Sequence, residues 1–125
     1  MATNVPSVFL EKEGGNKELK VEDNKEFQVI LAGNPSTGFG WYMSNSDNVK
    51  SSNVVEILNL NEYGSSDYAS NAHPPGMVGV GGAYCFKFKV KNGAGKELPK
   101  LTFEYKRPWE KDVPPHGRAE ITLKL

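Results

Sequence analysis

Apolar and polar residues alternate along several short stretches of this chain, and no stretch has the longer apolar period of an amphipathic helix. In each alternating stretch every second residue is apolar, as expected for a strand with one side against a core and the other in water. Glycine (13 residues) and proline (8 residues) interrupt every candidate helix. The stretches that we predict to be strands are Phe27–Leu31, Trp41–Met43, Tyr84–Val90, Leu101–Tyr105 and Ala119–Leu125.

Three shorter stretches add to this set. Glu18–Glu22 and Val54–Leu58 are predicted strands, and Ser7–Glu11 is either an added edge strand or an unpaired arm. Short strands separated by Asn-Gly, Gly-Gly and Pro-Pro turns indicate an all-β fold, and here they favour an immunoglobulin-like antiparallel β-sandwich. Asn59–Pro75 is polar and is expected to be a surface excursion, whereas Lys91–Gly95 is expected to form a tight turn.

The length and composition fit one folded domain. We assign residues 1–125 to a single domain, in which residues 1–18 can form an N-terminal arm. A chain of this length can bury a core without help from a metal ion or a disulfide bond. Its one cysteine, Cys85, cannot form an internal disulfide, so the fold must depend on packing.

Charge and hydropathy exclude several kinds of partner. Lys plus Arg and Asp plus Glu each number 15, so the formal net charge is +0, whereas nucleic-acid binders usually carry a basic face. No segment is long and apolar enough to span a bilayer or to act as a secretory signal. We therefore expect no nucleic-acid or membrane partner. The localisation stays open between a cytoplasmic chain and a vesicular or lysosomal chain whose signal has been removed.

Three connections between predicted strands have more elaborate sequences than a turn needs. They are Gly33–Trp41 (GNPSTGFGW), Gly76–Gly82 (GMVGVGG) and Lys106–Gly117 (KRPWEKDVPPHG). Because the strands between them run up and down, the three connections can lie at the same end of a sandwich. Loops at one end of an immunoglobulin-like sandwich form a continuous binding edge.

The first connection is expected to be stiff. Pro35 fixes its own φ angle, and the Asn34 side chain can hydrogen-bond to the backbone two residues on. Gly38 lets the chain reverse, which leaves Ser36 and Thr37 as small polar groups at the tip. The alternative is an Asn-Pro turn that only starts the following strand.

The second connection exposes backbone. The glycines at Gly79, Gly81 and Gly82 allow N–H and C=O groups to approach another chain closely, as in strand addition. Apolar side chains lie among them, at Met77, Val78 and Val80. No GK[ST] sequence follows, so this is not a phosphate-binding loop. A flexible connector is the alternative.

The third connection contains Arg107, Pro108 and Trp109. Tryptophan and arginine are the residue types most often found at energetic hot spots of interfaces. Trp109 follows the alternating run and lies beside a proline and a glutamate, so we expect it to be exposed. Trp41, which has the parity of a strand, is expected to be buried.

Candidate catalytic residues do not form a coherent set. A catalytic cysteine needs a nearby base or a helix N-terminus to activate its thiolate, whereas Cys85 lies within a predicted strand, on the parity of Lys87 and Lys89. His73 and His116 lie in proline-rich segments without metal-ligand spacing. A Ser36–His116–Asp112 triad can be written, but any chain of this size permits such a list. We therefore predict that the protein is not an enzyme and uses no metal ion or cofactor.

The three connections together resemble the chagasin family of cysteine-peptidase inhibitors. The motifs that carry the resemblance, in this order and spacing, are Asn34-Pro35-Ser36-Thr37-Gly38-Phe39, Gly79-Val80-Gly81-Gly82 and Arg107-Pro108-Trp109. The likeness extends from about residue 19 to residue 125. It implies an immunoglobulin-like sandwich that inhibits papain-like cysteine peptidases reversibly, without covalent chemistry, and we expect a monomer when the protein is free.

The resemblance also implies roles for individual residues. Ser36 and Thr37 would enter the catalytic centre of the peptidase, with Thr37 near its active-site cysteine and histidine. Gly76–Gly82 would lie along the non-primed side, with Val78, helped by Met77, facing the S2 pocket. On the primed side, Arg107 and Trp109 would cover the peptidase. The family pattern commonly has threonine where this chain has Ser36, a change that keeps the hydroxyl and drops one methyl group.

Two other functions remain open from the residues alone. A carbohydrate- or ligand-binding β-sandwich could use Trp109, Tyr63 and Tyr68 as stacking surfaces, although this leaves the glycine-rich connection unexplained. An adhesion-type domain without a defined pocket would make all three connections simple turns.

Overall fold

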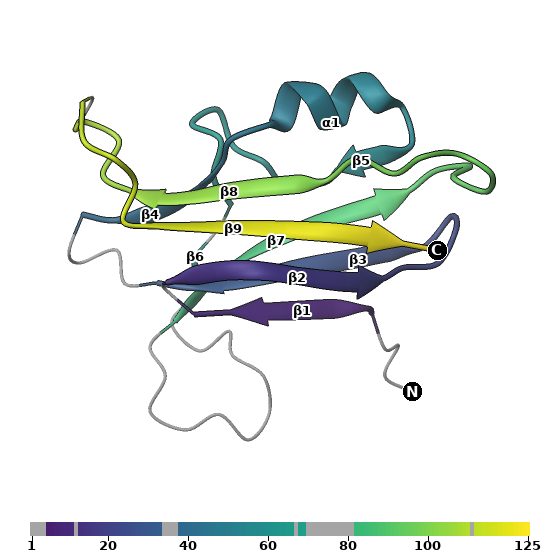
Figure 1. Cartoon of the computed structure of the whole chain (residues 1–125), viewed down its shortest axis with the longest axis horizontal. Coiled ribbons are helices and arrows are strands. Elements are labelled where there is room, and N and C mark those ends of the chain that lie inside the picture. The colour runs from purple at the N-terminus through teal and green to yellow at the C-terminus, as the bar shows by residue number, and fades with distance from the viewer. Residues whose placement is uncertain (1–4, 12, 34–37, 67, 70–81, 111) are drawn as a thin grey trace.

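The structure is a computed structural model, and it describes residues 5–11, 13–33, 38–66, 68–69, 82–110 and 112–125. Within these residues two sheets pack against each other as a sandwich (Figure 1). One sheet has the strand order β1-β3-β7-β5, with β6 also paired to β7, and the other has the order β2-β9-β8-β4. The strands are β1 (Ser7–Leu10), β2 (Gly14–Lys20), β3 (Glu26–Ala32), β4 (Gly40–Met43), β5 (Val55–Ile57), β6 (Tyr68–Ala69), β7 (Ala83–Val90), β8 (Leu101–Lys106) and β9 (Gly117–Lys124).

The core lies between the sheets and contains the alternate apolar residues of the predicted strands, together with others such as Val21 and Val49. Aromatic rings from the two sheets meet there, with the Phe86 and Phe103 ring centroids 4.8 Å apart. Trp41 is fully buried, as predicted. Leu125 is the exception to the predicted parity, because it lies beyond the end of β9 and is exposed. Removing this apolar surface from water is the main force that holds the sheets together.

The β-sandwich prediction is confirmed, but two of the strand pairings are parallel. β1 runs parallel to β3, and β2 runs parallel to β9. The turn between β1 and β2 carries the chain from one sheet to the other, so these consecutive strands do not form a hairpin with each other. Ser7–Leu10 is therefore an edge strand and not an unpaired arm.

The described residues include one short helix that the sequence pattern did not indicate. One short helix, α1 (Ser46–Ser52), follows β4 and buries Val49. It ends at Asn53, which adopts a left-handed conformation with φ of 60°. Seven residues with one buried side chain are too few to produce a recognisable helical period, which is why the pattern did not reveal α1.

In the described part of the span 59–75, residues 61–63 are exposed, as expected for a surface excursion, but residues 64–66 are attached to the sandwich. Ser65 is buried, and its hydroxyl donates a hydrogen bond of 2.6 Å to the carbonyl of Trp41. The N–H group of Met43 donates to the carbonyl of Gly64 at 2.7 Å. These bonds satisfy backbone groups of β4 on the side away from β8, so the segment covers an edge strand.

A side-chain amide fills a gap along β7. The Asn59 amide donates to the carbonyl of Cys85 at 2.8 Å and accepts from the N–H of Lys87 at 2.9 Å. These two groups lie between the part of β7 that pairs with β6 and the part that pairs with β5. The connection after β7 is also longer than the predicted tight turn, because β8 begins only at Leu101.

Candidate functional site: three loop stems at one end of the sandwich

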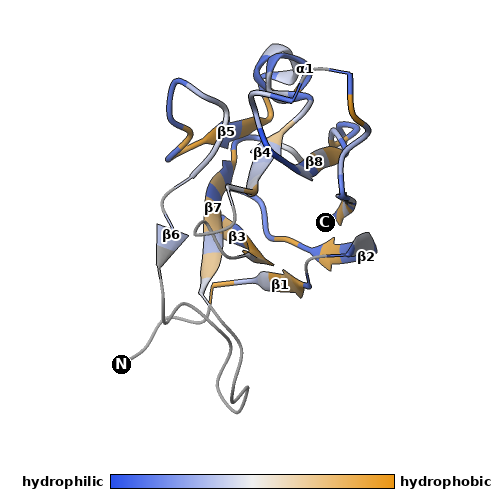
Figure 2. Cartoon of the chain, turned by 90° about the vertical axis from the view of Figure 1, so that its left-hand side faces the viewer, coloured by the Kyte–Doolittle hydropathy of each residue, from blue (hydrophilic) through white to orange (hydrophobic). Residues whose placement is uncertain are grey.

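The strand registers place the stems of the three connections at one end of the molecule, the loop end. Ala32, the last residue of β3, pairs with Ala83, the first residue of β7. Gly40, the first residue of β4, pairs with Lys106, the last residue of β8. β9 also begins there, because Gly117 pairs with β8 near its end. The loop end is at the left of Figure 1, and Figure 2 turns it toward the viewer.

The structure describes some of the predicted contact residues and not others. Gly38, Gly82, Arg107, Pro108 and Trp109 belong to the described part, and all five lie at the loop end. The remaining predicted residues lie outside the described residues, namely Asn34, Pro35, Ser36, Thr37, Met77, Val78, Gly79, Val80 and Gly81.

Backbone hydrogen bonds join the stems of the first and second connections. The N–H group of Gly33 donates to the carbonyl of Gly82 at 3.1 Å, which extends the β3–β7 pairing by one step. The N–H group of Gly82 donates to the hydroxyl oxygen of Tyr68 at 2.9 Å. The Trp41 indole N–H donates to the carbonyl of Ala32 at 2.8 Å and so links the two strands that the first connection joins.

Two tyrosine rings lie against Gly33, the residue with which the first connection begins. A Cβ atom placed on Gly33 would lie 3.0 Å from the Tyr84 ring and 3.2 Å from the Tyr105 ring, so a side chain at this position would push against both rings. Both tyrosines are buried. Burial raises the pKa of Tyr84 to about 12, with smaller contributions from neighbouring tyrosines. The first connection therefore starts over two buried, uncharged tyrosine side chains, Tyr84 and Tyr105, which we call the tyrosine floor.

The third connection contacts the end of the first. The guanidinium of Arg107 lies 4.4 Å from the centroid of the Phe39 ring. Phe39 also stacks on Tyr105, with ring centroids 5.3 Å apart. Trp109 has 65% of its surface exposed, whereas Trp41 has none, so the predicted difference between the two tryptophans is confirmed.

Sequence reasoning did not identify Phe39, Tyr84 or Tyr105 as residues that shape the site. The alternating pattern gives Tyr84 and Tyr105 core positions, and both are buried. That they lie under the connections depends on pairing between strands far apart in the sequence, which the pattern does not contain. Phe39 was visible only as the residue that ends the first motif.

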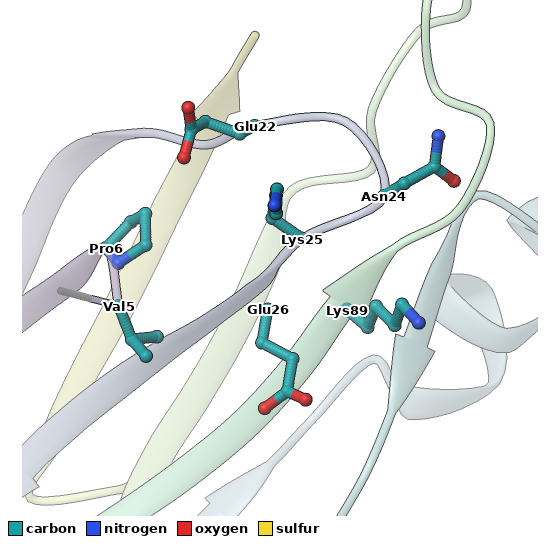
Figure 3. Close-up of a pocket in the computed structure, with 7 residues that line it drawn as sticks. All are labelled: Val5, Pro6, Glu22, Asn24, Lys25, Glu26 and Lys89. Atoms are coloured by element: carbon teal, nitrogen blue, oxygen red, sulfur yellow. The ribbon is translucent and has the colours of Figure 1, made fainter. Parts of the chain in front are cut away.

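Other features of the described residues offer no competing site. A hollow of about 410 Å³ opens at the opposite end of the molecule, the far end, between the start of β3 and the end of β7 (Figure 3). Its lining includes two acids, Glu22 and Glu26, and two bases, Lys25 and Lys89, so no charge of one sign prevails. No cluster of three metal-binding side chains occurs among the described residues, and no helix there is long and apolar enough to cross a membrane.

A protein-family comparison identifies the chain. The model of the chagasin family, described as peptidase inhibitor I42, matches residues 20–124. The chain belongs to the chagasin family of peptidase inhibitors. Amoebiasin-1 of Entamoeba histolytica is 30% identical to it over 117 residues, which cover 93% of this chain and 95% of that protein. The resemblance drawn from the three motifs is thereby confirmed.

Solved structures agree with the fold. The crystal structure of the cysteine protease inhibitor EhICP2 from Entamoeba histolytica matches with a TM-score of 0.58 and 18% identity, over 99% of each chain. The solution structure of Amebosin matches with a TM-score of 0.50 and 22% identity, over 95% of this chain and 99% of that one. At these identities the two matches support the fold alone.

Family membership also decides between the functions left open by the sequence. Chagasin-family proteins are inhibitors and not enzymes, which confirms the prediction that the chain is not an enzyme.

The carbohydrate-binding alternative expected Tyr68 to offer an exposed ring for stacking, and the structure does not show this. Tyr68 is half-buried against the core, its ring makes an edge-type contact with the Tyr84 ring, and its hydroxyl accepts a backbone hydrogen bond.

Proposed function

We propose that the protein is a reversible, tight-binding and non-covalent inhibitor of papain-like cysteine endopeptidases. Its three connections at the loop end would block the active-site cleft, and the free inhibitor would be a monomer formed by one domain, residues 1–125. The observation that carries the proposal is the strand register, because it gathers the stems of all three family motifs at one end.

Each connection would have its own part of the cleft. Thr37, with Ser36 beside it, would approach the catalytic cysteine and histidine. Met77, Val78 and the glycine-rich backbone would follow the non-primed side, with Val78 at the S2 pocket. Trp109 and Arg107 would cover the primed side. Such a plug resists cleavage if it presents no scissile carbonyl aligned with the catalytic thiolate.

Three properties of the described residues support tight binding. The exposed Trp109 supplies the aromatic surface that interface hot spots favour. The Gly33–Gly82 hydrogen bond and the tyrosine floor limit the motion of the stems, so less conformational entropy is lost on binding. The balanced charge gives no long-range repulsion from an enzyme of either sign.

Titration of an active-site-titrated papain with the protein tests the proposal. We expect residual activity to fall linearly to an equivalence point near one inhibitor per active site, and to return on dilution or after competition with a second inhibitor. A bovine pancreatic trypsin assay provides the control, because a serine peptidase should keep its activity. Full papain activity at micromolar protein, or cleavage of the protein during the assay, would contradict the proposal.

A further inference from the structure

Phe39 is surrounded by residues of the third connection and of β8. The Arg107 guanidinium lies over one side of its ring, and the Tyr105 ring stacks on it at 5.3 Å. The His116 ring is 5.4 Å away, measured between centroids, at a tilt of 50°. Arg107 is itself held by an ion pair with Glu110, with 3.9 Å between nitrogen and oxygen. Phe39, the last residue before β4, is therefore held by the third connection as well as by β8.

Trp109 contacts Gly38, the residue before Phe39 in the first connection. A Cβ atom placed on Gly38 would lie 2.6 Å from Cη2 of the Trp109 indole and 3.1 Å from Cζ2. Gly38 has φ of +86°, which L-residues with side chains rarely adopt. The indole therefore packs directly on Gly38, and any side chain at this position would displace it. At the same time, 65% of the Trp109 surface stays exposed to water.

We propose that the third connection braces the first, so that Phe39 is a positioning residue for inhibition. Arg107 holds Phe39, and Trp109 covers Gly38, so the backbone that leaves the tip of the first connection is fixed before a peptidase arrives. The inference rests on the proposed function, since it assigns part of the effect of Arg107 to this brace and not to direct contact with the enzyme.

The physical basis is preorganisation. A loop that is already ordered loses less entropy on binding, so the gain appears as affinity without any new contact to the partner. A guanidinium over an aromatic face is a directional attraction that strengthens when the pair is partly shielded from water. The Arg107 side chain is about two-thirds shielded, at 37% exposure, which suits a bracing role better than a solvated cation waiting for a partner.

A double-mutant cycle separates bracing from direct contact. Arg107→Gln removes the cation, and Phe39→Leu removes the ring that the cation faces. If Arg107 acts through Phe39, Arg107→Gln should raise the Ki for papain about 10-fold in the parent protein and less than about 2-fold in the Phe39→Leu background. If the fold-changes in Ki of the two single variants simply multiply in the double variant, the two residues act independently, and this would overturn the brace.

Conservative replacement adds a second readout. Phe39→Tyr keeps an aromatic face toward Arg107 and should inhibit within about 3-fold of the parent. If Phe39→Leu does not fold, Phe39→Met replaces it in the cycle, because methionine keeps a large apolar side chain but offers no aromatic face to Arg107. Arg107→Gln should then again have less than about a 2-fold effect in the Phe39→Met background. Fold-changes that simply multiply in this pair would also count against the brace.

Nuclear magnetic resonance of the free protein tests the brace without any peptidase. The indole that rests on Gly38 should shift the Gly38 Hα resonances by its ring current, and Phe39→Leu and Arg107→Gln should both reduce this shift. Unchanged Gly38 shifts in both variants would overturn the inference, even if the parent inhibits papain. Conversely, a parent protein that fails to inhibit while its Gly38 shifts behave as expected would contradict the proposed function and leave the brace intact.

Discussion

The two ends of the sandwich are held together by different interactions. At the far end, the Asp23 carboxylate accepts hydrogen bonds from the N–H groups of Gly93 (2.7 Å) and Ala94 (3.3 Å). The Asn24 side chain accepts another from the N–H of Asn92, at 3.2 Å. At the loop end a backbone hydrogen bond joins the first and second connections, but the third connection meets the first through aromatic and cationic contacts and leaves a large tryptophan surface exposed.

With the proposed function, this difference would let the same scaffold separate stability from binding. Turn N–H groups at the far end are satisfied within the molecule, so a partner would gain little by approaching them. Aromatic surface at the loop end remains in water, where burial against a partner is favourable. We therefore expect variants at the far end to change stability, and variants at the loop end to change inhibition.

The largest expected effect on inhibition is that of Trp109→Ala. Truncating an exposed hot-spot tryptophan should weaken binding to papain by about 1–3 kcal/mol, mostly through faster dissociation. The melting temperature should stay close to that of the parent, because 65% of this side chain is exposed. Inhibition and dissociation rates, measured by progress curves, check the prediction.

Tyr63→Ala is the matched control for this variant. Tyr63 is an even more exposed aromatic residue, at 75%, but it lies in the turn beside β4 and not in one of the three connections. Its replacement should leave inhibition unchanged. Equal losses in the two variants would mean that exposed aromatic surface in general, and not the loop end, carries the binding.

The next effect concerns the tyrosine floor beneath the loop end. The pKa of Tyr84 is raised from 10.0 to about 12 in the folded protein, so the fold favours the neutral phenol. The contribution of Tyr84 to stability should therefore be fully present below about pH 10 and be lost, by on the order of 2 kcal/mol, between pH 10 and 12, as the unfolded chain loses the proton first. Urea unfolding at a series of pH values measures this.

Replacing Tyr84 with phenylalanine measures how much of this alkaline loss of stability comes from its phenol group. Tyr84→Phe should flatten the decline between pH 10 and 12, whereas Tyr63→Phe, on the exposed turn, should leave it unchanged. A Tyr84→Phe variant that declines as steeply as the parent would show that other groups cause the alkaline loss.

Asp23→Ala should produce a smaller effect, and this effect should fall on stability and not on inhibition. It leaves two N–H groups of the far-end turn without their acceptor, so the free energy of unfolding should fall by about 1–2 kcal/mol. The Ki for papain should not change when it is measured well below the melting temperature. Weaker inhibition by a fully folded Asp23→Ala protein would mean that the two ends do not divide stability and binding as we suggest.

The smallest effect is expected from modification of Cys85. Burial raises the pKa of its thiol, and the thiol donates to the Gln28 side-chain oxygen at 3.0 Å, so iodoacetamide should react slowly under native conditions. Cys85 lies on the outer side of its sheet, within β7 and in none of the three connections, and the alkylated protein should inhibit like the parent. Mass spectrometry alongside the papain assay follows both outcomes, and loss of inhibition in the folded adduct would give the thiol an unforeseen role.

The sequence predicted most of the strands because their pattern is local. Phe86, Phe88 and Val90 alternate with polar residues along β7, and burial of one side of a strand requires such an alternation. Leu31 and Trp41 were assigned to the core for the same reason. The three motifs located the candidate site because each is a short, recognisable stretch of the chain.

What the sequence did not reveal depends on contacts between residues that are far apart in the chain. The Asn59 amide replaces a strand partner on β7, and the Asn45 amide does the same for Lys100 and Thr102 beside β8. Asparagine in a polar stretch carries no signal of such a role. The contact of Arg107 with Phe39 joins residues 68 positions apart, and no spacing rule relates them.

A crystal structure of the protein bound to papain tests the central claim most directly. The account predicts that the loop end enters the cleft, with Trp109 buried on the primed side and the Asp23 turn left in solvent at the far end. A complex in which the enzyme contacts the far end, or an outer surface of either sheet, while Trp109 stays exposed would contradict it.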